Sequence, residues 1–176
     1  MSSTDHHYLI LDTSILLIWL KVPGYSTCGK GDNTWDFEKI NSLIEEEIKN
    51  GTYLVLPLAS IIETANPITQ ISNLKCRVEA AGGLVDVIKK TAISETPWMA
   101  FSNQEEFWNS EELSNLAMRW LEEVKKEGKV MSLADLSIIK IAELYSQLGT
   151  VRILSGDGNL QSYQPKHNAY IPRRSQ

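Results

Sequence analysis

Four acidic residues stand at places in the sequence where they could act together. Asp12 and Asp157 each follow a short apolar segment that is predicted to be a strand. Glu63 and Asp135 each lie on a predicted helix. In an open α/β sheet, ligands collect outside the carboxyl ends of the strands. If the strands of Asp12 and Asp157 are neighbours, both carboxylates project into one crevice, and the helices that carry the other two acids pack above the same edge.

Such a group of carboxylates predicts a metal centre. Several carboxylates within a few ångströms cannot all stay ionised without a cation. Hard oxygen ligands in this number suit Mg²⁺ or Mn²⁺. A site of this kind activates a water molecule and stabilises the leaving oxygen in phosphodiester hydrolysis.

Three of these acids also have a plainer interpretation. Asp12 is a good N-cap for the helix predicted to follow it. Glu63, taken alone, is a solvated residue on the outside of a helix. Asp157 lies in the sequence Ser-Gly-Asp-Gly-Asn, which is typical of a turn. Each alternative stays open for the residue by itself, and the metal interpretation depends on all the acids together.

Asp135 is the most informative of the four acids. Together with Ser132 it has the form of a capping box, although the usual reciprocal residue is Glu or Gln. On a helical wheel, however, Asp135 lies between Ile138, Ile139 and Ala142. This position predicts that its carboxylate points toward an apolar face, where a charge needs a partner or a metal ion.

The elements that must position these acids alternate between strand and helix. This order predicts an α/β protein with a mostly parallel sheet covered on both faces. We treat 1–176 as one domain, with 1–7 flexible and with 22–35 and 94–110 as loops or insertions. The predicted strands are 8–11, 53–56, 96–101, 151–154 and 168–171, and the predicted helices are 15–20, 36–49, 58–65, 67–88 with a possible break at 82–83, 110–127 and 132–148.

Composition limits the class of protein. The 176 residues are 43% hydrophobic, which is ordinary for a globular chain, and no apolar run is long enough to span a bilayer. The net charge of −5 argues against tight non-specific binding of nucleic acid. Neutralising four acids with metal leaves 17 basic against 18 acidic residues, a net charge of −1, which weakens that argument. Two distant cysteines and no signal peptide predict a cytoplasmic chain with reduced thiols.

Four segments carry a resemblance to a known family. They are 11–14 (Leu-Asp-Thr-Ser), 56–63 (from Leu-Pro to Ile-Ile-Glu), 133–139 (Leu-Ala-Asp-Leu-Ser-Ile-Ile) and 153–157 (Ile-Leu-Ser-Gly-Asp). In this order they resemble the motifs of the PIN domain, a family of metal-dependent nucleases that includes the VapC-type toxins. The resemblance spans about 8 to 171 and implies a three-layer α/β/α fold with a mostly parallel central sheet of four to five strands.

The resemblance also implies an activity and a set of site residues. It implies an Mg²⁺- or Mn²⁺-dependent endoribonuclease that cleaves RNA, and a toxin of this kind would have an antitoxin protein and could form a homodimer. Many members have a further Asp where this chain has Asn159. An Asn side chain can ligate a metal ion but carries no charge, so this difference weakens the case for a second metal ion. The insertions at 22–35 and 97–108 are long for a compact toxin, so they weaken the case for membership of the toxin subgroup. The implied metal ligands and catalytic residues are Asp12, Glu63, Asp135 and Asp157, and the implied supporting residues are Ser14, Ser155 and Asn159.

Other residues are candidates for contacts with substrate. The segment 24–31 is a near miss for a phosphate-binding P-loop, because its last residue is Gly and no strand directly precedes it. We interpret it as a loop beside the crevice. The candidates for phosphate contacts are Lys30, Lys75, Arg77 and Lys166.

Two further interpretations compete with the ribonuclease. The same carboxylates could cleave DNA or flap structures. Alternatively, the chain could be a catalytically silent PIN-like module that binds RNA or protein. The aromatic side chains of 97–108 are interpreted as a patch of core under a loop, with base stacking or a partner surface as the alternatives.

Overall fold

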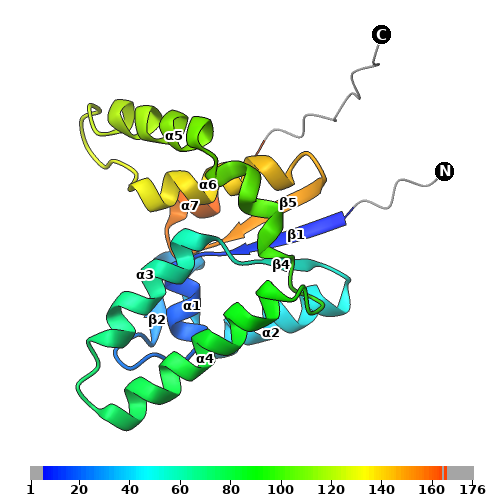
Figure 1. The fold of residues 1–176 in the computed structure, drawn as a ribbon. Helices are drawn as coiled ribbons and strands as arrows, with labels where there is room; N and C mark the ends of the chain where they lie inside the picture. The colour runs from blue at the N-terminus through cyan, green and yellow to red at the C-terminus, as the bar shows by residue number, and fades with distance from the viewer. Residues whose placement is uncertain (1–5, 164, 166–176) are drawn as a thin grey trace, which may run out of the picture.

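The apolar segment that precedes Asp12 forms the central strand of a parallel sheet. The computed structural model describes residues 6–163 and 165, and its main sheet has the order β4-β1-β5 (Figure 1). Strand β1 (His6–Leu11) pairs in parallel with β4 (Tyr53–Val55) on one side and with β5 (Gly149–Leu154) on the other. The strands that lead to Asp12 and Asp157 are therefore neighbours, as the metal interpretation requires.

Residues 8–11 of strand β1 are buried on both faces, which explains their continuous apolar sequence. Tyr8 and Ile10 pack into a cluster with side chains of α6 (Leu133–Tyr145). Leu9 and Leu11 face the other way and pack with α1 (Thr13–Trp19) and α2 (Phe37–Lys49). The expected α/β fold with helices on both faces of a parallel sheet is therefore confirmed.

The remaining elements surround this centre. In Figure 1, α3 and α4 lie beside each other on the side of α1 and α2, and α5 packs against α6 on the opposite side. Among the described residues, no helix is long and apolar enough to cross a membrane. The remaining elements are β2 (Thr27–Cys28), η1 (Gly31–Asn33), β3 (Trp35–Asp36), α3 (Leu58–Thr69), α4 (Leu74–Ala92), η2 (Phe101–Trp108), α5 (Ser110–Glu123) and α7 (Gly158–Gln161).

The described sheet is smaller than the four to five strands expected. The segment 96–101 contributes one isolated bridge, in which Leu54 donates to the carbonyl of Pro97 and accepts from the amide of Met99, both at 2.9 Å. Pro97 lacks an N–H with which to extend the ladder, and the chain turns into η2 at Phe101. The expected strand at 168–171 lies outside the described residues.

Two other expectations about element boundaries were wrong. Helix α3 does not break at Asn66 but continues to Thr69 with Pro67 inside it. Pro67 lacks the N–H that would bond to the carbonyl of residue 63, but it stands in the last turn, so only the end of the helix is affected. Helix α4 also runs through 82–83 without a break, and its start is capped by Asn73, whose side chain accepts from the amide of Cys76 at 3.0 Å.

The segments predicted to be flexible or loop-like contain regular structure. His6 and His7 belong to β1, where they pair with Gly149 and Thr150, so the flexible start does not include them. Residues 1–5 lie outside the described part of the chain. The insertion at 22–35 carries the antiparallel pair β2-β3.

The aromatic stretch packs largely into the core. Trp98 and Phe107 are buried, and the ring of Phe107 meets that of Trp108 edge-on with centroids 4.5 Å apart. The buried side chain of Gln104 donates to the carbonyl of Leu56 at 2.9 Å and so ties η2 to the end of β4. For Trp98 and Phe107 the interpretation as core is confirmed, and base stacking by these two rings is excluded by their burial.

Candidate active site

Asp12 is a buried carboxylate at the carboxyl end of β1. Its exposed fraction is 6%, and although it occupies the N-cap position of α1, its side chain makes no capping hydrogen bond. Instead, Oδ2 accepts from the hydroxyls of Ser14 and Ser155, each at 2.7 Å. Burial raises the pKa of Asp12, the two hydroxyls oppose that rise, and the charge of Asp135 adds to it. Helix capping therefore does not account for this residue.

The two serines also fasten the loop after β5 to the start of α1. Ser155 accepts from the amide of Asp157 at 2.9 Å, and Ser14 accepts from the amide of Gly156 at 2.9 Å. Each hydroxyl therefore donates to Asp12 and accepts from the loop. Both serines stand in the positions expected of supporting groups.

Glu63 reaches the same place from α3. It is half-buried, and its Oε2 accepts from the hydroxyl of Thr13 at 3.0 Å. Burial raises the pKa of Glu63, and the charges of Asp12 and Asp135 raise it further. Glu63 is therefore not a solvated surface residue but a neighbour of the other acids. The role of Thr13 was missed in the sequence because a residue that follows an Asp at a helix start has no distinguishing pattern.

The side chain of Asp135 points in a different direction from the one expected. It forms the capping box, in which Ser132 N donates to Asp135 Oδ2 at 3.0 Å and Ser132 Oγ accepts from the amide of Asp135 at 3.0 Å. The side chain therefore turns back toward the helix start and is half-buried, while Ile138 and Ile139 fill the core. The expectation that its carboxylate enters an apolar face was wrong. Its charge nevertheless acts on both Asp12 and Glu63.

Asp157 is paired with a lysine that the sequence did not single out. Its Oδ1 accepts from the amide of Asn159 at 2.8 Å, which caps α7, and its Oδ2 accepts from Nζ of Lys129 at 2.5 Å. The contact with Lys129 lowers the pKa of Asp157. The same contact raises the pKa of Lys129, and the charge of Asp135 adds to that rise. A cavity of ≈ 250 Å³ is lined by Asp135, Asp157, Asn159 and Lys129.

The β2-β3 hairpin braces the loop that carries Asp157. Nδ2 of Asn33 lies 3.4 Å from the carbonyl of Ser155, and Oδ1 of Asn33 accepts from the indole N–H of Trp35 at 2.7 Å. Cys28 packs so tightly on Gly156 that a Cβ added to the glycine would lie 2.6 Å from Cys28 Sγ. Gly156 is therefore required by close approach of the hairpin.

The candidate cations differ in their distance from the acids. Lys30 is exposed and follows Gly29, whose backbone contacts the loop at Gly156, so it stays a candidate. Lys75 pairs with Glu79 at 3.9 Å on α4, beyond the end of α3 that is remote from the sheet. Arg77 lies near it and donates to the carbonyl of Ile71 at 3.1 Å, which holds the turn between α3 and α4. The structure therefore does not bring this pair to the acids, and Lys166 lies outside the described residues.

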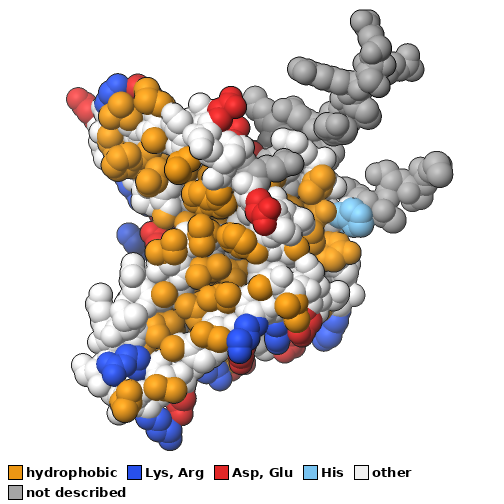
Figure 2. All heavy atoms as spheres, viewed as in Figure 1, with side chains coloured by type: hydrophobic (Ala, Val, Ile, Leu, Met, Phe, Trp, Pro, Cys, Tyr) orange, Lys and Arg blue, Asp and Glu red, His pale blue; other side chains and the backbone are white. Residues whose placement is uncertain are grey.

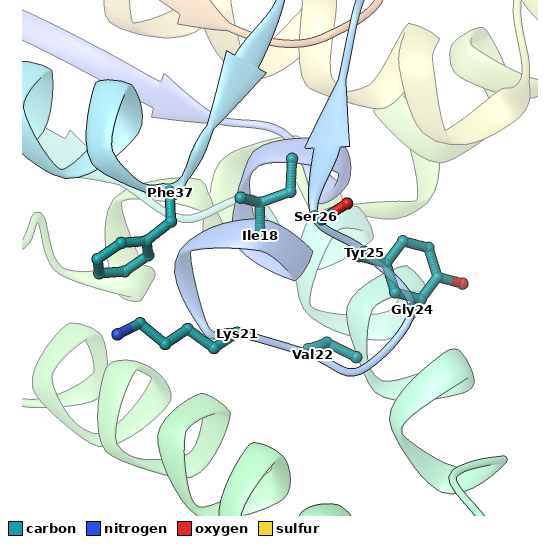
Figure 3. Close-up of a pocket in the computed structure, with 7 residues that line it drawn as sticks. All are labelled: Ile18, Lys21, Val22, Gly24, Tyr25, Ser26 and Phe37. Atoms are coloured by element: carbon teal, nitrogen blue, oxygen red, sulfur yellow. The ribbon is translucent and has the colours of Figure 1, made fainter.

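A larger cavity lies elsewhere. It has a volume of ≈ 520 Å³ and is lined in part by Ile18, Val22 and Tyr25, with none of the acids among its lining residues (Figure 3). The figure shows Lys21 reaching toward Phe37, and its Nζ lies 3.9 Å from the ring centroid. The cation is therefore already engaged with an aromatic ring, and we do not assign the site to this cavity.

The acids fit a divalent cation by their chemistry, although they do not form a closed cage. Within the described part of the chain, no three acidic, histidine or cysteine side chains stand together as a ready-made metal site. An ionised buried carboxylate needs a positive partner, whereas the side chains that contact Asp12 are hydroxyls. Carboxylate oxygens from Asp12, Glu63 and Asp135 are the donors that Mg²⁺ and Mn²⁺ prefer.

Comparison with known proteins identifies neither a family nor a function for this chain. No family model, curated protein or solved structure matches this chain. The function must therefore be argued from the geometry and charge of the residues described above.

Proposed function

We propose that this chain is an Mg²⁺- or Mn²⁺-dependent endoribonuclease of PIN type. One observation carries the proposal: Asp12, Glu63 and Asp135 come from three different elements, and the charge of Asp135 raises the pKa of both Asp12 and Glu63. They meet at the carboxyl edge of a parallel sheet, where α/β proteins place their ligands. Ionised acids that repel one another destabilise the folded chain unless a cation binds among them.

The residues of the chain have separate roles in this proposal. Asp12, Glu63 and Asp135 hold the cation, and the hydroxyls of Ser14 and Ser155 fix the orientation of Asp12. When bound, such a cation lowers the pKa of a water molecule and stabilises charge on a phosphate. The protein supplies a buried and oriented carboxylate, so little reorganisation is needed when the substrate arrives.

The choice of RNA as substrate comes from the order of the four motifs. Asp12, Glu63, Asp135 and Asp157 follow one another as the acids of the PIN pattern do. A role as the toxin of a toxin–antitoxin pair, an antitoxin partner and a homodimer belong to the same proposal.

A second candidate function has an observation of its own. An apolar cavity of ≈ 260 Å³ lies between α3, α5 and α6, and Ile62, Trp108 and Leu133 are among the residues that line it. Glu63 also lines this cavity, so the cavity adjoins the acids. Figure 2 shows hydrophobic side chains running down this face from α5 toward α4. These features favour a catalytically silent module that binds a protein partner.

Cleavage assays separate these functions. The purified chain, Asp12→Asn and Asp36→Asn are incubated with a mixed RNA pool, single-stranded DNA and branched DNA at equal Mn²⁺, with and without chelator. Asp36 is an exposed helix cap remote in sequence from the motifs, so its variant makes the same chemical change outside the site. We expect Mn²⁺-dependent cleavage of RNA that Asp36→Asn retains and Asp12→Asn loses by about 100-fold or more.

The other outcomes are equally informative. Preferential cleavage of either DNA substrate, lost in Asp12→Asn, would assign the site to a DNA or flap nuclease. A wild-type chain that cleaves nothing, and whose melting temperature Mn²⁺ leaves unchanged, would favour the silent binding module.

A further inference from the structure

Asp157 differs from the other acids because both of its oxygens are already engaged within the chain. Oδ2 accepts from the ammonium of Lys129 at 2.5 Å, and Oδ1 accepts from the amide of Asn159 at 2.8 Å. The first contact is a charge-assisted hydrogen bond. A metal ion at Asp157 would have to displace one of these partners.

The other three acids each keep one oxygen that no described side chain contacts. Hydrogen bonds from side chains reach Asp12 only at Oδ2 and Glu63 only at Oε2. The capping bond reaches Asp135 at Oδ2. Each of these carboxylates therefore keeps an oxygen without a hydrogen bond from a described side chain, and these oxygens are the donors that the proposed function assigns to one divalent cation.

Lys129 places a positive charge next to Asp157. It stands in the loop between α5 and α6, directly after Gly128, whose φ of +87° turns the chain. Its side chain shares the ≈ 250 Å³ cavity with Asp135 and Asp157, and its ammonium forms an ion pair with Asp157. The neutral side chain of Asn159 lines the same cavity, and Glu123, which also lines it, is paired with Lys126, so this part of the site has little unpaired negative charge to offer a second divalent ion.

We propose that Lys129 takes the place of a second metal ion: the chain holds one divalent cation on Asp12, Glu63 and Asp135, and the Lys129 ammonium stays on Asp157. This inference rests on the proposed function of the acids as a metal site. It assigns the second positive charge of the centre to the protein itself.

Mn²⁺ titration of the metal-free full chain tests the inference without any measurement of activity. The number and affinity of bound ions are read by calorimetry and by electron paramagnetic resonance of free Mn²⁺ for wild type, Lys129→Met and Lys126→Met. Lys126 lines the same cavity but pairs with Glu123, so its variant removes an equal charge without touching Asp157. An Asp12→Asn sample identifies which binding event belongs to the site.

We expect one Mn²⁺ in wild type and in Lys126→Met, and two in Lys129→Met. The second ion should bind to Lys129→Met and not to wild type, because the competing ammonium and its repulsion of a divalent ion are both removed. The Lys129 side chain is 68% exposed, so the variant should fold, and circular dichroism checks this.

Two results would overturn the inference while leaving the metal site intact. One is a second site-dependent Mn²⁺ in wild type, and the other is a Lys129→Met variant that still binds one ion with unchanged affinity. Absence of Mn²⁺ binding in all of the proteins would overturn the proposed function, and the inference with it.

Discussion

Replacing Asp12 by Asn should stabilise the metal-free protein at neutral pH. Asp12 is buried, and its ionised side chain contacts hydroxyls rather than a cationic side chain. Burial raises its pKa, so the folded state keeps the proton to a higher pH than the unfolded chain does. Stability therefore falls as pH rises from the unfolded pKa to the folded pKa, and the full penalty applies above that window. Asn has the same shape and removes the charge.

The size of the gain follows from the burial of the group. Relieving a buried polar group whose desolvation is incompletely compensated is worth about 1 to 3 kcal/mol. For a chain of this length, each kcal/mol shifts the melting temperature by about 2 to 4 °C. The gain should be largest near pH 7.5 and should vanish below the unfolded pKa of an Asp, about 3.9.

Thermal unfolding followed by circular dichroism between pH 3.5 and 8, in chelator, measures this gain. The control is Asp36→Asn, because Asp36 is exposed and caps α2 through the amide of Lys39 at 2.9 Å. Asn caps as well as Asp, so this variant should stay within about 0.5 kcal/mol of wild type at every pH. With Mn²⁺ at about 100 times its Kd, wild type should gain about 2.7 kcal/mol that Asp12→Asn lacks.

Two outcomes would refute this reasoning. A metal-free Asp12→Asn protein that is less stable than wild type at pH 7.5 would show that the buried carboxylate is already well compensated. A gain that stays constant from pH 3.5 to 8 would show that it does not come from the charge of Asp12.

Two further predictions concern the loop that follows β5. Ser155→Ala removes a hydrogen-bond donor to buried Asp12. Because hydrogen bonds to charged groups are worth about 1.5 to 3 kcal/mol, urea unfolding at pH 7.5 should show that the free energy of unfolding falls by about that amount. An unchanged urea midpoint would mean that the hydroxyl does not support the carboxylate. Gly156→Ala places a Cβ 2.6 Å from Cys28 Sγ, so overpacking should cost about 1 to 3 kcal/mol in the same assay. Gly158→Ala is its control, because nothing lies within 4 Å of a Cβ there, and equal stability of these two variants would contradict the packing described.

The part of the site that the sequence predicted depends on local patterns. A continuous apolar run identifies β1 and a largely apolar segment identifies β5, and strand–helix alternation predicts their parallel pairing, so Asp12 and Asp157 could be placed at the same edge. The placement of Glu63 on α3 followed from the same reasoning. These features come from hydrophobic burial, which the sequence pattern records directly.

The part that was missed depends on side-chain direction and on tertiary contacts. The helical wheel placed Asp135 correctly on α6, but the capping box with Ser132 turned its carboxylate away from the apolar face. Lys129 stands in a loop and meets Asp157 across 28 residues, so no local pattern marks it. The approach of Cys28 to Gly156 likewise appears only when the hairpin folds onto the loop.

The central claim is that acids from different elements form one cation-dependent nuclease centre, and Glu63 tests it most directly. Glu63 lies 50 residues from Thr13, to which it is hydrogen-bonded, and it reaches the other acids only through the packing of α3 on α1. The measurement is cleavage of a mixed RNA pool by wild type and Glu63→Gln, with Mn²⁺ and with chelator. The account predicts cleavage by wild type in Mn²⁺ alone and its loss in a folded Glu63→Gln protein. Equal Mn²⁺-dependent cleavage by both proteins would contradict the account.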